Sequence, residues 1–346
     1  METMRAWMAY GQEKMELKEV PTPVPGPGEV LVKIRAVGIC GSDMHFYKEG
    51  RIGQFVVEEP IILGHECAGE IAGIGAGVEG RRIGERVVVE PGIPCFHCHD
   101  CKTGRYHFCN DMKFMGTPPT DGCLCEYVAW PAELVHRMPD GMSYEEGAMV
   151  EPFVVGMQAM RNSRIRFTDD AVVIGTGPIA MMTIQSLKVI GANKIICVGR
   201  NPWKLELAGR MGATHLIDSK EEDVKKRVKE LTGGYGAMHV FEAVGSDETF
   251  WQTTELVRDG GTVTLLGLMA HDHTPMPMAS VVMHGISFVP VIRYSNLFAE
   301  AIGSLEYKRA DIMPVLSHTF GFEQGQEAFQ KVAHDNREVM KTIILM

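Results

Sequence analysis

The sequence predicts an α/β protein with two domains, a β-rich domain and a doubly wound domain built on a parallel sheet. The length of 346 residues is more than twice the roughly 150 residues of a typical domain. Short apolar runs divided by proline and glycine fill about the first 150 residues, and strand-like runs alternate with helix-like ones from Asp170 onward. Alternation of the second kind is typical of a parallel sheet covered by helices.

The first part of the chain has the pattern of short paired strands. The runs Val30 to Val37 and Arg86 to Glu90 are rich in valine, and proline and glycine punctuate residues 21–28 and 73–84. Such punctuation separates strands that fold back on one another. The last segment of the chain is too short for a separate domain, so we expect residues 1–152 together with 292–346 to form the β-rich domain.

The middle of the chain has the pattern of βαβ units. A strand-like run from Ala171 to Gly175 is followed by an apolar helical stretch from Pro178 to Ile190 and by a second strand-like run from Lys194 to Val198. Further strand-like runs fall at 213–218, 237–243 and 261–268, each after a helix-like stretch. We expect residues 153–291 to form a doubly wound dinucleotide-binding domain.

Composition excludes several classes of protein. The formal charge of −10 provides no basic surface for phosphate backbones, so nucleic acid is not an expected partner. No apolar run reaches the ~20 residues of a membrane span, and the first residues do not form a secretory signal. We therefore expect a cytoplasmic protein without a membrane partner.

Four of the nine cysteines form a compact group, Cys95, Cys98, Cys101 and Cys109. Thiolates at this spacing can surround one Zn²⁺ as a tetrahedron, and four protein ligands leave no position for substrate. The spacing therefore predicts a structural zinc site. An iron–sulfur cluster fits less well, because the Cys-Pro ending and short final spacing of bacterial ferredoxins are missing. Reduced thiols without a metal are the other alternative.

A second set of metal ligands is dispersed along the chain: Cys40, His65, Glu66 and Glu151. A thiolate, an imidazole and a carboxylate from separate segments can hold a catalytic zinc that keeps one open position. Each residue alone also has an ordinary interpretation, as a core cysteine, a buried histidine or a carboxylate at a helix start. The pattern Gly64-His-Glu-x-x-Gly69-x5-Gly75-x-x-Val78 favours the metal, because its glycines permit tight turns beside a site.

A phosphate-binding turn is predicted between the first strand and the first helix of the second domain. The segment Gly175-Thr-Gly177-Pro178-Ile179-Ala180 places glycines where the chain turns and where a pyrophosphate meets the helix N-terminus. The next strand ends in Gly199-Arg200 without the acidic residue that holds the adenosine ribose of NAD. An arginine there can neutralise a 2′-phosphate, so we expect a preference for NADP(H) over NAD(H).

With these motifs, the chain resembles the medium-chain zinc-dependent alcohol dehydrogenases, in particular the sorbitol (L-iditol) and xylitol dehydrogenase branch. Three stretches carry the closer match: Cys40 to Tyr47 with Gly50 to Phe55, Glu151 to Gly156, and Val291 to Asn296. The resemblance implies a GroES-like catalytic domain and a Rossmann cofactor domain.

The resemblance also implies roles for individual residues. Catalytic zinc would lie on Cys40, His65 and Glu151, with Glu66 as a ligand or a partner through water. Ser42 and His45 occupy proton-relay positions. The residues implied to meet substrate are Phe46, Glu151, Arg293 and Tyr294, and those implied to line the cofactor are Gly175, Gly177, Pro178, Ile179, Gly199, Arg200 and Arg293. Relatives usually have tyrosine at the position of Phe46, so one hydroxyl contact to a polyol is missing here.

The expected function is hydride transfer between a polyol and a ketose, with one catalytic and one structural zinc per chain and a homotetramer or homodimer as the assembly. Animal sorbitol dehydrogenases lack the thiol quartet, which places this chain nearer the bacterial and yeast-like members. The alternatives are a dehydrogenase for threonine, a butanediol or an amino-cyclitol, and a zinc-stabilised protein of the same fold that has lost turnover. A zinc module that binds nucleic acid is disfavoured by the acidic charge.

Overall fold

The structure is a computed structural model that describes residues 2–269, 271, 273–335 and 337–346. The chain forms two compact units: unit 1 comprises Met1–Glu151, Phe298–Glu306 and Leu316–Met346, and unit 2 comprises Pro152–Leu297 and Tyr307–Val315. This division departs from the expected grouping of 292–346 with the first domain, because 292–297 and 307–315 belong to unit 2. Hydrogen bonds account for the difference: Arg161 donates to the Ser295 carbonyl at 2.9 Å, and the Asp311 N–H donates to Gln185 at 3.1 Å.

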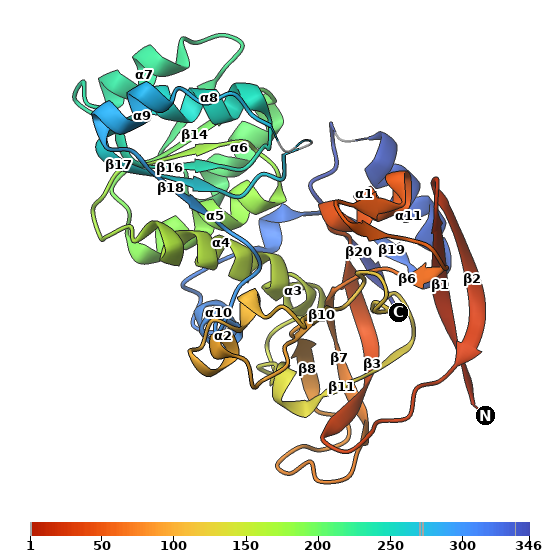
Figure 1. The fold of residues 1–346 in the computed structure, drawn as a ribbon. Coiled ribbons are helices and arrows are strands. Elements are labelled where there is room, and N and C mark those ends of the chain that lie inside the picture. The colour runs from red at the N-terminus through yellow and green to blue at the C-terminus, as the bar shows by residue number, and fades with distance from the viewer. Residues whose placement is uncertain (1, 270, 272, 336) are drawn as a thin grey trace. The chain divides into compact units, whose positions relative to one another are not determined.

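Unit 1 is built on a seven-stranded sheet (Figure 1). Its central strand β3 (Glu29–Gly38) has alternating buried and half-buried residues, as expected for a strand with one face on a core. The order is β12-β8-β7-β3-β20-β19, and β11 also pairs with β3. The other strands of this sheet are β7 (Glu66–Ile74), β8 (Arg86–Val89), β11 (Tyr127–Pro131), β12 (Val135–Arg137), β19 (Leu316–Gly321) and β20 (Lys341–Leu345).

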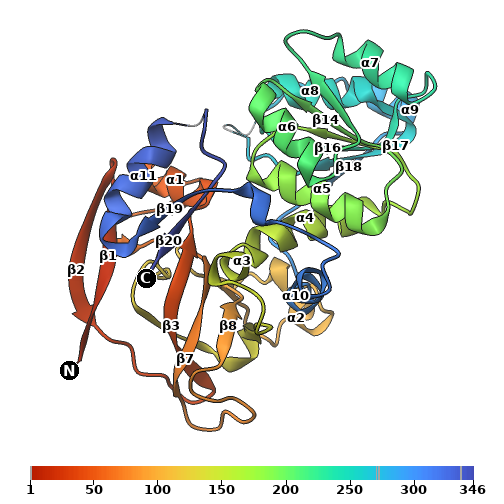
Figure 2. The ribbon, with the colours of Figure 1, turned by 180° about the vertical axis from the view of Figure 1, so that it is seen from behind.

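The remaining elements of unit 1 surround this sheet. A three-stranded sheet has the order β2-β1-β6, and two two-stranded sheets pair β4 with β5 and β9 with β10. Helices α1 and α11 contact one another, as both views show (Figures 1 and 2). The strand bounds are β1 (Thr3–Gly11), β2 (Lys14–Pro21), β4 (Arg51–Ile52), β5 (Phe55–Val56), β6 (Ile61–Ile62), β9 (Gly92–Ile93) and β10 (Lys113–Phe114); the helices are α1 (Gly41–Glu49), α2 (His99–Lys102), α3 (Tyr144–Ala148), α10 (Phe298–Glu306) and α11 (Gly325–His334), with short 3-10 turns at η1 (Tyr106–Phe108), η2 (Ala132–Leu134) and η4 (Phe322–Gln324).

Unit 2 is a parallel six-stranded sheet in the order β15-β14-β13-β16-β17-β18, the doubly wound order whose reversal point lies between its first and fourth strands. The strands are β13 (Ala171–Ile174), β14 (Ile195–Gly199), β15 (His215–Asp218), β16 (Ala237–Glu242), β17 (Val257–Leu265) and β18 (Ser287–Pro290). The neighbouring strands β13 and β14 are apolar and buried along their whole length, as expected of strands covered on both faces. Figure 1 shows α8 and α5 over opposite faces of this sheet.

The helices of unit 2 follow its strands in the expected alternation. Pro178 to Ile190 forms α5 with the predicted bounds, and Gly191 ends it in a left-handed conformation. The unit boundary falls within α4. The helices are α4 (Val150–Ser163), α5 (Pro178–Ile190), α6 (Pro202–Met211), α7 (Val224–Leu231), α8 (Asp247–Leu256) and α9 (Met278–His284), with a 3-10 turn η3 (Met313–Val315).

The predicted fold class is confirmed: a β-rich domain and a doubly wound parallel-sheet domain. The described part of the chain holds no helix with the length and apolar character that crossing a membrane requires.

Candidate functional site

The metal-binding candidates Cys40, His65 and Glu66 lie together in unit 1. One ligand atom of each falls within 4.8 Å of the others. Strand pairing explains the meeting, because Gly38 at the end of β3 lies opposite Glu66 at the start of β7. Cys40 then begins α1 as its N-cap, and His65 directly precedes β7. The structure thus brings together residues that are 25 positions apart in the chain.

Asp43 joins the two segments that carry Cys40 and His65. Its buried carboxylate accepts a hydrogen bond from the Cys40 N–H at 2.9 Å and from the Gly64 N–H at 3.0 Å. The same carboxylate lies 3.5 Å from His65 Nδ1, which leaves Nε2 of that ring for a metal. Burial opposes a charged imidazole, but the Asp43 carboxylate and Cys40 outweigh it, so the pKa of His65 is raised well above its usual range.

The sequence analysis did not single out Asp43, although its position was informative. An aspartate in the third position of a helix whose N-cap is a cysteine can bond back to the cap. The capping interaction holds the thiol of Cys40 at the start of the helix.

Lys341 is a second residue that the sequence analysis missed. Its ammonium, with the side chain only 2% exposed, forms an ion pair with the fully buried Glu66 carboxylate and donates to the Ile39 carbonyl at 2.9 Å. Burial lowers the pKa of Lys341, but Glu66, Cys40 and Glu151 outweigh this and raise it above its ordinary value. The available signal was one lysine, the single charged residue of the run Val339 to Leu345.

Gly38 makes room for this ion pair. A Cβ atom there would lie 2.2 Å from Glu66 Oε2 and 3.2 Å from the Lys341 side chain. The glycines of the Gly64-His-Glu pattern are also required where other atoms leave no room for a side chain. Only Gly64 has a positive φ, of 90°, whereas a Cβ on Gly69 would lie 2.2 Å from the Lys33 carbonyl oxygen. Close approach of two strands, more than tight turning, therefore explains the glycine pattern.

The other predicted residues of this site have separate positions. Glu151 is the second residue of α4, is 4% exposed, and lies outside the group formed by Cys40, His65 and Glu66. Ser42 is half-buried on α1, and His45 is exposed on the same helix with Nδ1 3.3 Å from Glu49. Phe46 packs into the hydrophobic core of unit 1.

The donor set fits zinc. Thiolate, imidazole and carboxylate are the ligands that Zn²⁺ takes in catalytic sites. Both Glu66 carboxylate oxygens are buried; Oε2 is paired with the Lys341 ammonium, whereas no partner of Oε1 is found among the described residues. A buried carboxylate beside a thiol and an imidazole has the chemistry of a cation site.

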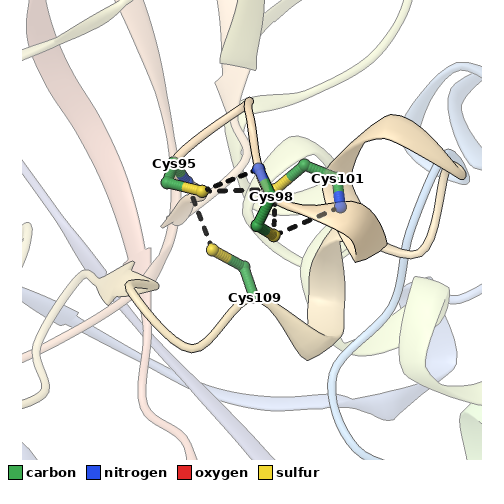
Figure 3. A group of neighbouring side chains, drawn as sticks. All are labelled: Cys95, Cys98, Cys101 and Cys109. Carbon is green, nitrogen blue, oxygen red and sulfur yellow. Dashed lines mark hydrogen bonds between the residues drawn. The ribbon is translucent and has the colours of Figure 1, made fainter.

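The thiol quartet also lies together in unit 1, on a loop around α2 (Figure 3). Backbone N–H groups donate to its sulfur atoms, from Cys95 to Cys109 Sγ at 3.2 Å and from Cys98 to Cys95 Sγ at 3.3 Å. The Sγ atoms of Cys98 and Cys101 are 3.4 Å apart. A hydrogen bond with the backbone of His97 lowers the pKa of the Cys95 thiol to about 6. Four sulfur atoms this close, with N–H groups directed at them, fit a tetrahedral zinc.

The predicted phosphate-binding turn lies at the carboxyl end of β13 in unit 2. Gly175 has φ of 113°, and Gly177 is the N-cap of α5 with Pro178 at the first helical position. Among the described residues, no atom beyond the chain neighbours of Gly177 lies within 4 Å of its Cβ position, so a ligand can approach the backbone there. Ile179 is half-buried in the first turn of the same helix.

The end of β14 borders this turn. A Cβ on Gly199 would lie 2.4 Å from Thr176 Cγ2, so only glycine fits beside the loop. Arg200 follows it and is exposed. The predicted substrate residues Arg293 and Tyr294 lie in unit 2 after β18, where Arg293 has φ of 50° and Tyr294 is 4% exposed.

Comparisons with known proteins identify the class. Residues 26–140 match the family model "Alcohol dehydrogenase GroES-like domain", and residues 178–306 match "Zinc-binding dehydrogenase". Sorbitol dehydrogenase from Bacillus subtilis is 36% identical over 99% of this chain and 97% of its own. D-xylulose reductase from Morganella morganii is 37% identical over 91% of this chain and 93% of its own.

Solved structures agree with the sequence relatives. An Escherichia coli oxidoreductase/dehydrogenase of unknown specificity superimposes with a TM-score of 0.96 at 32% identity, covering 99% of both chains. A zinc-binding dehydrogenase from Sinorhizobium meliloti solved with NADP superimposes with a TM-score of 0.92 at 25% identity, covering 100% of both chains. A short chain alcohol dehydrogenase from E. coli, complexed with NADH, has the same TM-score and identity over 99% of both chains.

The fold and the two cysteine-containing clusters are those of a zinc-dependent oxidoreductase. The chain belongs to the medium-chain zinc-dependent alcohol dehydrogenase family, in the branch of the sorbitol and xylitol dehydrogenases.

Proposed function

We propose that this enzyme interconverts a polyol and a ketose by hydride transfer, with NADP(H) preferred over NAD(H). The cluster of Cys40, His65 and Glu66 within 4.8 Å carries the proposal. It is supported by relatives of similar length that are named for sorbitol and D-xylulose.

In this proposal Cys40 and His65 hold the catalytic zinc, and Glu66 and Glu151 are the carboxylates available to complete its ligands. A zinc ion held by these residues would supply Lewis-acid chemistry and lower the pKa of a bound alcohol, as it does that of bound water. Asp43 keeps His65 oriented for that role, through the contact of 3.5 Å with its Nδ1. The Lys341 ammonium holds Glu66 in place and balances its charge.

Proton movement is assigned to α1. The Ser42 hydroxyl, two residues after Cys40 in the chain and half-buried, accepts the proton of the alcohol and gives up its own hydroxyl proton toward His45. His45 lies on the exposed side of the same helix, beside Glu49, and releases that proton to water. An imidazole is suited to this step because its ordinary pKa lies near neutrality.

The substrate and cofactor positions follow the family resemblance. Arg293, Tyr294 and Glu151 are proposed to meet the hydroxyl groups of the polyol, and Phe46 in place of tyrosine removes one such contact. A bound nicotinamide cofactor would supply the hydride acceptor for oxidation of the alcohol. Its pyrophosphate is proposed to lie on the N-terminus of α5, beside Gly175 and Gly177.

Arg200 is proposed to select NADP(H). It stands where a carboxylate would bond the ribose of NAD, and its exposed guanidinium can pair with a 2′-phosphate. The residues Pro178, Ile179, Gly199 and Arg293 are proposed to complete the cofactor site.

The thiol quartet Cys95, Cys98, Cys101 and Cys109 is proposed to hold a second, structural zinc. Reduced thiols of this kind suit a cytoplasmic enzyme, because disulfides form in oxidising compartments. A homodimer or homotetramer is the proposed assembly.

A spectrophotometric panel at 340 nm tests this function. Pentitols, hexitols and their ketoses are assayed with NADP(H) and NAD(H) in parallel, beside L-threonine and 2,3-butanediol. We expect polyol or ketose turnover, lost in Cys40→Ser, with higher kcat/KM for NADP(H). Turnover of threonine or butanediol without any polyol would overturn the substrate class, and higher kcat/KM with NAD(H) would overturn the cofactor preference.

A further inference from the structure

Glu242 ends β16 in unit 2, and its carboxylate accepts hydrogen bonds from the loop that follows it and from the first turn of α8. The residue is 1% exposed. Its Oε1 accepts hydrogen bonds from the Val244 N–H at 2.9 Å, the Gly245 N–H at 3.0 Å and the Thr249 hydroxyl at 2.8 Å. Oε2 accepts a further bond from the Gly245 N–H at 3.2 Å. Within the described residues no ion pair involving Glu242 is found, so N–H and O–H dipoles alone balance its charge.

The loop that Glu242 holds is in direct contact with the phosphate-binding turn. Ile174, the residue before Gly175, lies opposite Glu242 across the β13–β16 pair. The Ala243 N–H donates to the Ile174 carbonyl at 3.0 Å. A Cβ on Gly175 would lie 3.0 Å from Val244 Cγ2 and 3.1 Å from the Ala243 carbonyl oxygen. The loop after β16 therefore limits where the backbone of Gly175 can be.

The loop after β17 is fixed by the same carboxylate residue. The backbone carbonyl of Glu242 accepts from the Leu266 N–H at 2.8 Å and the Gly267 N–H at 3.1 Å. A Cβ on Gly267 would lie 2.5 Å from Glu242 Oε2 and 2.1 Å from the Gly245 nitrogen. Three successive loops at the carboxyl edge of the sheet thus pack with glycine at each contact, around one buried carboxylate.

The position of this packing in the fold points to a ligand function. Open doubly wound sheets bind ligands at the carboxyl edge, where the strand order reverses. In this sheet the reversal lies between β13 and β16, which are the strands that carry Gly175 and Glu242. Because its oxygens are already engaged by its own loop, Glu242 is not a substitute for the missing ribose-binding acid.

We propose that Glu242 is a positioning residue for the nicotinamide dinucleotide. It sets the loop Ala243–Ser246 as a wall against the phosphate-binding turn, and cofactor affinity depends on its negative charge. The inference rests on the proposed function, in which the Gly175 turn binds the dinucleotide.

The Glu242→Gln variant tests the charge with little change in shape. Its amide directs hydrogen atoms at N–H groups that need an acceptor, so the loop loses part of its support. We expect the Kd for NADPH, measured by the fluorescence of the bound nicotinamide, to rise about tenfold, which corresponds to the loss of one charge-assisted hydrogen bond. We expect kcat at saturating cofactor and the KM for the alcohol to change less than about threefold.

Asp169→Asn is the matched control. Asp169 is a largely buried acid of the same unit that lies before β13, accepts from the Arg166 N–H at 2.9 Å and contacts His239 at 3.3 Å. Loss of the Asp169 carboxylate is expected to lower the melting temperature. We expect the Kd of this variant for NADPH to stay within about twofold of the wild-type value. If Glu242→Gln does not fold, a second pair of variants tests the same contact: Thr249→Val removes the hydroxyl that donates to Glu242, and Thr249→Ser keeps a hydroxyl there. We then expect weaker NADPH binding in Thr249→Val and unchanged binding in Thr249→Ser.

Three outcomes separate the hypotheses. Weaker NADPH binding in Glu242→Gln or Thr249→Val, with Asp169→Asn and Thr249→Ser unchanged, supports the inference. Unchanged binding in both loop variants, or equal weakening in the Asp169 control, overturns it. A wild-type enzyme that binds neither NADPH nor NADH overturns the proposed cofactor site, and the inference with it.

Discussion

Replacing Lys341 by methionine is expected to destabilise unit 1 more than any surface change. The substitution keeps a similar volume and removes the ammonium that balances Glu66. The carboxylate is fully buried, and the ion pair is shielded from solvent on both sides. The Ile39 carbonyl also loses a donor at 2.9 Å.

The magnitude follows from burial. Removal of one partner of a buried pair typically costs about 3–5 kcal/mol, because the other charge is left without compensation. If the cost comes from the remaining charge, Glu66→Gln in the same chain recovers much of it. The double variant is then expected to be more stable than Lys341→Met alone.

The cost is measured by urea unfolding, with hydrogen exchange of the β3 and β20 amides as the probe, because these strands lie beside the ion pair. These strands pair directly, with Ile343 opposite Gly38. The wild type, both single variants and the double variant form a double-mutant cycle. A loss below about 1 kcal/mol for Lys341→Met, or a double variant with strictly additive losses, would refute the account of Lys341 as the counter-charge of Glu66.

Three further predictions concern the other sites. Cys98→Ser is expected to lower the melting temperature and to lower the zinc content, measured by atomic absorption, from two ions per chain to one. The control Cys197→Ser, which replaces a buried cysteine of unit 2, is expected to keep both ions. Retention of two ions in Cys98→Ser would contradict the structural zinc site. Arg200→Ala is expected to raise the KM for NADPH about tenfold or more and to change that for NADH little, because it removes one charged contact to a phosphate; equal effects on both cofactors count against the 2′-phosphate assignment. Burial lowers the pKa of His239 below its ordinary value of 6.5, so as pH falls the imidazole is protonated in the unfolded chain before it is protonated in the folded one. The free energy of unfolding of the wild type is therefore expected to decrease as pH drops below 6.5. Urea unfolding at several pH values should show a smaller decrease in His239→Asn, and the same dependence on pH in both proteins would contradict this prediction.

Much of the fold could be predicted because the two domains differ in local pattern. Pro178 to Ile190 is apolar, begins with proline after a glycine and ends before a glycine, so the bounds of α5 followed from local signals. The strand at 261–268 was predicted too late, because β17 begins at Val257, within a run of charged and glycine residues. The assignment of 292–297 and 307–315 to unit 2 depends on hydrogen bonds to Arg161 and Gln185, and no local pattern reports such long-range contacts.

The site divides in the same way between sequence and structure. The sequence alone determined the residue types and spacings that a metal requires, namely the thiol quartet, the cysteine in Cys40-Gly-Ser-Asp43 and the Gly64-His65-Glu66 pattern, because ligand chemistry resides in side chains. Only the tertiary structure decided which charges face one another. Lys341 is about 275 positions from Glu66 in the chain, and β20 must pair with β3, and β3 with β7, before the two side chains can meet. The role of Glu242 likewise depends on the loop after β16, which folds back onto its carboxylate. Hydrogen bonds and ion pairs act over a few ångströms, and chain folding alone sets which distant residues come within that range.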